Sequence, residues 1–140
     1  MIREAEVSDY AGICKVAVDD LGYECKPELV KYRLENLDSN REKVFVAETD
    51  GKIIGFIHAE MYNTLYFKSM INLQGLAVAN EYRHKGYGRA LLGDVEAWAK
   101  SKGVDLIRVN SGFSRKEAHE FYRNLGYDNE KEQIRFLKQL

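Results

Sequence analysis

Residues 73–92 of the chain read Leu73-Gln74-Gly75-Leu76-Ala77-Val78-Ala79-Asn80-Glu81-Tyr82-Arg83-His84-Lys85-Gly86-Tyr87-Gly88-Arg89-Ala90-Leu91-Leu92. The apolar beginning of this segment is typical of a β-strand, whereas its end opens a pattern with helical spacing that continues to Val95 and Trp98. A basic segment with two glycines lies between them. The order predicts a strand, a loop and the N-terminus of a helix.

The loop has the features of a phosphate-binding site. The first N–H groups of a helix have no intrahelical partner, and the helix dipole places about half a positive charge there. Gly86 and Gly88 lack the Cβ atoms that would hold a phosphate away from these groups. Three basic residues add full charges: Arg83, Lys85 and Arg89. We therefore predict a phosphate cradle over residues 83–89.

An ordinary tight turn with solvated basic side chains would also explain a glycine pair before a helix. Two common phosphate motifs do not fit the spacing. The dinucleotide fingerprint needs a third small residue where this chain has Leu91, and no Gly-Lys-Ser/Thr sequence follows for a P-loop. A nucleotide-binding module is therefore a poor alternative, and the pattern that remains is Arg83-x-x-Gly86-x-Gly88.

This pattern, with apolar residues on both sides, resembles the acetyl-CoA-binding segment of the GNAT superfamily of N-acetyltransferases. Two later segments are also similar to this family: Glu117-Ala118-His119-Glu120-Phe121-Tyr122 and Leu125-Gly126-Tyr127. With the order of elements, the resemblance spans essentially the whole chain. It implies acetyl-CoA as the acyl donor, while the spacing of the two cysteines argues against a metal site.

In the GNAT fold two parallel strands splay apart, and the pantetheine arm of the cofactor lies between them. The resemblance implies that β-strand backbone groups bind this arm and that the cradle binds the pyrophosphate. Gly75 within the strand also indicates a bulge or a close backbone approach. The cofactor-binding residues expected are Leu76, Ala77, Val78, Arg83, His84, Lys85, Gly86, Tyr87, Gly88, Arg89, Asn110, Ala118 and Tyr122.

Tyr122 matches the tyrosine that donates a proton to the departing CoA thiolate in this family. A phenol pKa of about 10 and a thiol pKa of about 8.5 permit that transfer. On an amphipathic helix Phe121 and Tyr122 could instead be core residues. Many GNAT members have an Asn seven residues before this tyrosine, where the present chain has Arg115. Three other polar residues could make the polar contact that this Asn provides: Asn110, Ser111 and Ser114.

An acceptor amine with a pKa of about 10 is mostly protonated at neutral pH, so its activation costs about 4 to 5 kcal/mol unless a base helps. Alternation places His58, Glu60 and Tyr62 on one strand face, with Gln74 expected nearby. We favour Glu60 as the general base and interpret His58 as a sheet histidine. The other two histidines are interpreted as a cradle residue and a helix-face residue: His84 and His119.

An acidic run follows the first helix and comprises Asp19, Asp20 and Glu24. The region resembles the acceptor-site wall of the superfamily, although a solvated helix end would explain the run equally well. If these residues line the site, they favour a cationic amine over an anionic acceptor. Aminoglycoside-like antibiotics, polyamines, amino acids, peptides and protein N-termini all remain as acceptors.

Length and composition limit the classes of protein to which the chain can belong. The 140 residues suit a single domain, which on folding buries roughly two-thirds of the surface that the unfolded chain exposes. The net charge of −1 gives no general basic field, so we expect neither nucleic acid nor membrane as a partner. Cys14 and Cys25 lack CxxC spacing, and no apolar signal core or 18-residue apolar run occurs. These features predict a cytoplasmic protein with free thiols.

The remaining patterns predict an α/β (α+β) fold with a mixed, mostly antiparallel sheet of six to seven strands and about four helices on both faces. The resemblance implies the GNAT type of this fold, with a central splayed parallel pair. The expected strands cover residues 2–6, 44–49, 53–62, 70–78, 104–109 and 133–140. The expected helix signals are a Ser8 cap, Pro27 in the first turn, a Gly103 end cap and a Ser114–Glu117 capping box.

The sequence therefore predicts an enzyme that moves acetyl from acetyl-CoA to a primary amine by direct attack in a ternary complex. Neither cysteine has a catalytic-looking partner, so no covalent intermediate is expected. The alternative is a non-catalytic CoA-binding sensor or interaction module. The connection between two of the expected strands is unusually aromatic and contains Tyr62, Leu65, Tyr66 and Phe67. We expect these side chains to be covered, either by a second copy of the chain in a homodimer or by the bound acceptor.

Overall fold

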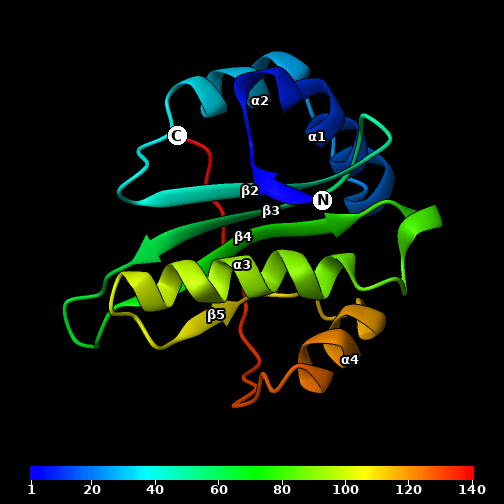
Figure 1. Ribbon diagram of the computed structural model, residues 1–140. Helices are drawn as coiled ribbons and strands as arrows, with labels where there is room; N and C mark the ends of the chain where they lie inside the picture. Colours follow the sequence, from blue (N-terminus) through cyan, green and yellow to red (C-terminus); the bar gives the residue numbers. More distant parts are fainter. The chain divides into compact units, whose positions relative to one another are not determined.

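The computed structural model describes the whole chain, Met1–Leu140, which forms two compact units. The first unit spans Met1–Asn110 and the second Ser111–Leu140. The first contains β1 (Ile2–Glu4), η1 (Val7–Asp9), α1 (Tyr10–Val16), η2 (Ala17–Leu21), α2 (Pro27–Glu35), β2 (Glu42–Thr49), β3 (Lys52–Tyr62), β4 (Met70–Val78), η3 (Asn80–Tyr82), α3 (Tyr87–Ser101) and β5 (Ile107–Val109) (Figure 1). The second contains α4 (Lys116–Asn124).

One mixed sheet with the strand order β1-β2-β3-β4-β5 organises the first unit (Figure 1). The first three pairings are antiparallel, and β4 and β5 are parallel. Asp50 and Gly51 join β2 to β3 with positive φ angles of 51° and 72°, which suits a tight hairpin turn. The mixed, mostly antiparallel sheet and the helical crossover from β4 to β5 are therefore confirmed.

The expected number of strands is wrong, because the sheet has five strands instead of six or seven. Residues 133–140 form no strand. Ile134 and Phe136 alternate as in a strand, but their side chains are 80% and 86% exposed. Alternation indicates which residues would share a face, whereas a strand also needs a partner ladder. The strand expected at 104–109 is also shorter and begins at Ile107.

Helices cover both faces of the sheet, as the sequence predicts. Ile13 and Val16 of α1 form a buried cluster with sheet residues such as Phe56. On the other face, a Cβ atom added at Gly55 would lie 3.4 Å from Leu91 of α3. Five residues of α3 are buried: Leu91, Leu92, Val95, Trp98 and Ala99. This packing fixes α3, and with it the loop that precedes it, against β4 (Figure 1).

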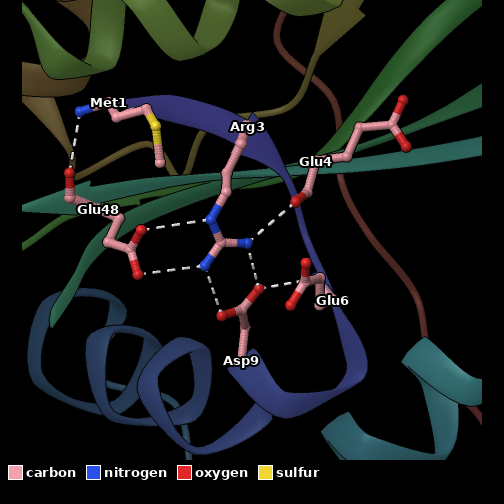
Figure 2. A network of polar contacts seen from close by, with 6 residues as sticks. All are labelled: Met1, Arg3, Glu4, Glu6, Asp9 and Glu48. Atoms are coloured by element: carbon pink, nitrogen blue, oxygen red, sulfur yellow. Dashed lines mark hydrogen bonds and ion pairs between the residues drawn. The ribbon is translucent and has the colours of Figure 1, made fainter. Parts of the chain in front are cut away.

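A carboxylate, and not the expected Ser8, organises the start of the first helix. The carboxylate of Asp9 accepts a hydrogen bond from the Glu6 N–H at 2.7 Å, and η1 begins after Glu6. Arg3 donates to both oxygens of Asp9 at 2.8 and 2.9 Å and reaches Glu48 at 3.4 Å (Figure 2). The Arg3 guanidinium lowers the pKa of Asp9. The network ties β1, η1 and β2 together.

The other helix signals have mixed outcomes. Pro27 occupies the first position of α2, and Gly103 follows α3 with a φ of 71°, so both of these predictions are confirmed. The expected Ser114 cap is wrong, because α4 begins after Arg115. No helix combines the length and the apolar character that crossing a membrane requires.

Candidate functional site

The open edge of β4 is the first feature of the site. The parallel register ends at the pair Leu73 and Val109, while β4 continues to Val78. Between β3 and β4, His58 pairs with Gly75 and Ala59 with Leu73, so Gln74 is an extra, bulged residue. The bulge that Gly75 indicates is therefore present. Beyond Leu73, β5 supplies no partner for the outward-facing backbone of β4.

The direction of the β4 backbone shows which groups remain open. The Ala79 N–H donates to the Ile54 carbonyl at 2.7 Å, so Ala79 faces β3. Backbone groups alternate along a strand, so Ala77 also faces β3, whereas Leu76 and Val78 face away from it. Arg83 Nε donates to the Val78 carbonyl at 3.4 Å. Of the three strand residues expected to bind the cofactor, Leu76 and Val78 therefore present backbone groups and Ala77 packs in the core.

The N-terminus of α3 directly follows this open edge. Its N-cap is Gly86, which has a φ of 89° and provides no side-chain cap. The first bond along the helix runs from the Ala90 N–H to the Gly86 carbonyl at 3.0 Å. The N–H groups of Tyr87, Gly88 and Arg89 therefore have no partner in the helix. The cradle supplies these open donors at the positive end of the helix dipole.

The three basic side chains of the cradle have different surroundings. Arg83 forms an ion pair with Asp20, whose side chain is only 5% exposed. Lys85 lies over the ring of Tyr82, with Nζ 5.7 Å from the ring centroid. Arg89 is exposed at the first turn of α3. Lys85 and Arg89 thus carry charge that an anion can reach, whereas Arg83 ties the cradle to the end of η2.

Five polar side chains, here called the polar row, cross β2 to β5: Glu42, His58, Glu60, Asn72 and Arg108. Paired residues share a face of a sheet, and the pairs Glu42–Glu60, Glu60–Asn72 and Asn72–Arg108 place the row on the face of Phe56. The face expected for His58, Glu60 and Tyr62 is therefore confirmed. Gln74 is the bulged residue and is exposed.

Hydrogen bonds link the members of the row. His58 Nε2 lies 2.8 Å from Glu42 Oε1. The Asn72 amide donates to Glu60 at 3.4 Å and accepts from Arg108 at 2.8 Å. Sequence reasoning missed Glu42, Asn72 and Arg108, because only the strand register brings them beside His58 and Glu60. Alternation along single strands would place each on a face but cannot choose their neighbours.

Tyr122 lies on α4 in the second unit and is half-buried. Its ring makes edge contacts with Phe121 and Tyr127, at centroid distances of 5.2 and 5.7 Å. Burial raises the pKa of Tyr122, so the phenol remains protonated at neutral pH. Ala118 lies one turn earlier on the same helical face. His119 Nε2 contacts the Gly112 carbonyl at 2.9 Å, in agreement with a helix-face role.

Proteins with sequences similar to this chain include several N-acetyltransferases. The Acetyltransferase (GNAT) family matches residues 9–127. The aminoalkylphosphonate N-acetyltransferase of Salmonella typhimurium is 29% identical over 144 residues, which cover 99% of this chain and 90% of that protein. An uncharacterized N-acetyltransferase of Chlorobaculum tepidum is 28% identical over 122 residues, with 85% of this chain and 74% of that protein covered.

Solved structures share the fold at lower identity. AAC(6')-Iy, solved with the bisubstrate analog CoA-S-monomethyl-acetylneamine, has a TM-score of 0.85 at 19% identity, covering 100% of this chain and 98% of that one. AAC(6')-IG of Acinetobacter haemolyticus has a TM-score of 0.83 at 16% identity, covering 100% and 99%. Because the family match extends over most of the sequence and includes the cradle and Tyr122, the chain belongs to the acetyltransferase (GNAT) family.

Proposed function

We propose that the protein transfers an acetyl group from acetyl-CoA to a primary amine of a small molecule or peptide, by direct attack in a ternary complex. One observation carries this proposal: the open backbone edge of β4 leads directly into the uncapped N-terminus of α3. An extended amide-containing arm and a pyrophosphate need these two features in this order. Membership of the GNAT family supplies the reaction class.

The cofactor would lie along the first unit from the strand to the cradle. Leu76 and Val78 would bond the pantetheine amides, where the parallel strand pair is open. The N–H groups at the start of α3 would bind the pyrophosphate, with added charge from Lys85 and Arg89. Arg83 would act by shaping the loop, because Asp20 occupies its guanidinium. His84, Asn110 and Ala118 remain proposed contacts.

We treat residues 1–140 as a single acetyltransferase domain, because the family match runs through both compact units. We also retain the cytoplasm as the proposed location. No group of three or more His, Cys, Asp or Glu residues is arranged to hold a metal ion.

The reaction needs a free amine and a protonated leaving group. The amine nitrogen would attack the thioester carbonyl, and the tetrahedral intermediate would collapse by breaking the C–S bond. Tyr122 would then give its proton to the CoA thiolate. Burial raises the pKa of the Cys14 thiol to about 11, so this cysteine is a poor nucleophile and direct attack is favoured.

Glu60 is the proposed base, and replacing it by glutamine tests this role. We expect Glu60→Gln to lower kcat/KM about 10²- to 10⁴-fold at neutral pH. The loss should shrink as the pH approaches the pKa of the amine, because the acceptor then loses its proton unaided. A loss for His58→Gln together with normal turnover of Glu60→Gln would instead move the base to His58.

The alternative, a CoA-binding sensor without turnover, shares the whole cofactor site. Thiol release from acetyl-CoA with a panel of amines separates the two functions. An enzyme releases CoA only when a suitable amine is present. A sensor binds CoA with no amine-dependent release.

The tip of the β3–β4 hairpin is proposed to pair with a second copy of the chain. Leu65, Tyr66 and Phe67 are 107%, 88% and 55% exposed, and aromatic residues are enriched in interface centres. Tyr62 is not included in this proposed interface, because its ring stacks on Arg108.

Light scattering at micromolar concentration should show a homodimer that the double variant Tyr66→Ser and Phe67→Ser converts to a monomer. The wild-type dimer would be lost because the two serines remove the apolar contact area. A wild-type monomer, with a double variant that keeps its acceptor KM, would exclude both a homodimer and a bound acceptor as the cover.

A further inference from the structure

Arg108 is held in a fixed orientation by neutral groups. Its Nη1 donates to the Asn72 amide oxygen at 2.8 Å and its Nη2 to the Asn110 amide oxygen at 3.2 Å. The guanidinium carbon lies 4.6 Å from the centroid of the Tyr62 ring. None of these groups neutralises the charge. A positioned guanidinium whose partners are all uncharged is suited to bind a carboxylate, phosphonate or phosphate.

The same row places Arg108 close to the proposed base. Asn72 bridges Glu60 and Arg108 through its amide. The Glu60 carboxylate and the Arg108 guanidinium contact opposite ends of this one amide, at 3.4 and 2.8 Å, so only a short gap separates them. A ligand that donates a hydrogen bond to Glu60 and accepts one from Arg108 must therefore be short. An amine separated from an anionic group by two or three carbon atoms meets this requirement.

We propose that the acceptor is a short zwitterion, whose amine faces Glu60 and whose anionic group binds Arg108. This inference rests on the proposed acetyl transfer and adds the acceptor class. It assigns to Arg108 the role of a specificity-determining residue, with Asn72, Asn110 and Tyr62 as the residues that position it.

The acidic run after α1 does not favour a polycation instead. Asp19 already pairs with Lys15 at 2.6 Å, and Asp20 pairs with Arg83. Only Glu24 of the three is left without a basic partner. The acidic groups that would be needed to attract several amino groups are therefore mostly neutralised within the protein.

The wild-type enzyme tests the inference with acceptors of matched length. β-Alanine and 2-aminoethylphosphonate carry the two anionic groups, and 3-aminopropan-1-ol and 1,3-diaminopropane are the neutral and cationic counterparts. With acetyl-CoA and thiol release as the readout, we expect kcat/KM to be at least about tenfold higher for one of the zwitterions. The comparison between carboxylate and phosphonate identifies the anionic group.

Variants of Arg108 locate the effect. Arg108→Gln should lower kcat/KM for the preferred zwitterion about 10- to 100-fold and leave 3-aminopropan-1-ol within about twofold. Arg108→Lys should recover part of the lost kcat/KM, because the lysine ammonium keeps the positive charge but cannot form the two parallel hydrogen bonds of a guanidinium. Lys52→Gln removes a charge from the exposed far end of β3 and should change neither acceptor.

The outcomes are distinguishable. Equal kcat/KM for zwitterionic and neutral amines in the wild type, or equal losses for both in Arg108→Gln, would overturn the acceptor class and leave acetyl transfer intact. If Arg108→Gln does not fold, the wild-type panel alone decides. The absence of thiol release with every amine would refute the proposed function and this inference together.

Discussion

Replacing Tyr122 by phenylalanine is expected to lower turnover by about 10²- to 10⁴-fold and to leave the affinity for acetyl-CoA nearly unchanged. The change removes the proton that the CoA thiolate would take, whereas the ring keeps its contacts with Phe121 and Tyr127. Because burial raises the pKa of Tyr122, the wild-type acid should stay protonated throughout the neutral and mildly alkaline range.

Turnover is measured as thiol release and affinity by calorimetry. Tyr32→Phe is the matched control, because it removes the hydroxyl of an exposed tyrosine on α2 and should alter neither quantity. Wild-type turnover in Tyr122→Phe would mean that solvent protonates the thiolate. Tyr122 would then be a packing residue.

Gly86→Val should weaken acetyl-CoA binding roughly 10- to 100-fold. Gly86 has a φ of 89°, a conformation that a β-branched residue strongly resists. Nothing lies within 4 Å of the Cβ position, so the added Cβ atom meets no protein atom, and the core should be unaffected because the loop lies at the surface. The loss would come from the changed loop and from a side chain beside the open N–H groups of α3.

Gly93→Val is the control for this variant. Gly93 lies in the same helix, its Cβ position is also open, and its φ is not positive. It should bind acetyl-CoA as the wild type does, apart from a small loss of helix stability. Unchanged affinity of Gly86→Val in calorimetry would refute the assignment of the pyrophosphate to the cradle.

Local signals made the centre of the fold predictable from sequence. The strand before the cradle, the helix after it and the Asp50–Gly51 hairpin each depend on a few neighbouring residues. Gly86 and Gly103 both adopt the positive φ angles that their positions in the pattern require. The crossover to a parallel strand follows because a helix lies between the two strands.

Features that depend on distant partners were not predictable. Arg83 looks like a phosphate ligand in the sequence, but Asp20, 63 residues away, occupies it. The neutral environment of Arg108 depends on the register of β4 with β5. Apolar and polar residues alternate over 133–140 as in a β-strand, but no neighbouring strand pairs with this segment. Periodicity alone therefore overestimated the number of strands in the sheet.

The start of the first helix shows a competition between two local signals. Ser8 fits the preference for a capping hydroxyl, but Asp9 has a carboxylate that can bond the Glu6 N–H and Arg3 together. A charge-assisted bond is stronger than a neutral one, so the carboxylate wins. The partner that makes this possible, Arg3, lies on β1 and is not part of any helix-capping pattern.

The central claim is that this protein transfers acetyl from acetyl-CoA directly to an amine. The most direct measurement mixes the protein with acetyl-CoA and the amine panel, and follows free thiol together with the masses of the amine and the protein. We expect thiol release that requires an amine and equals the acetylated amine formed, with no acetylated protein. Acetyl-CoA binding without amine-dependent release, or an acetylated protein that forms before the product, would contradict the account.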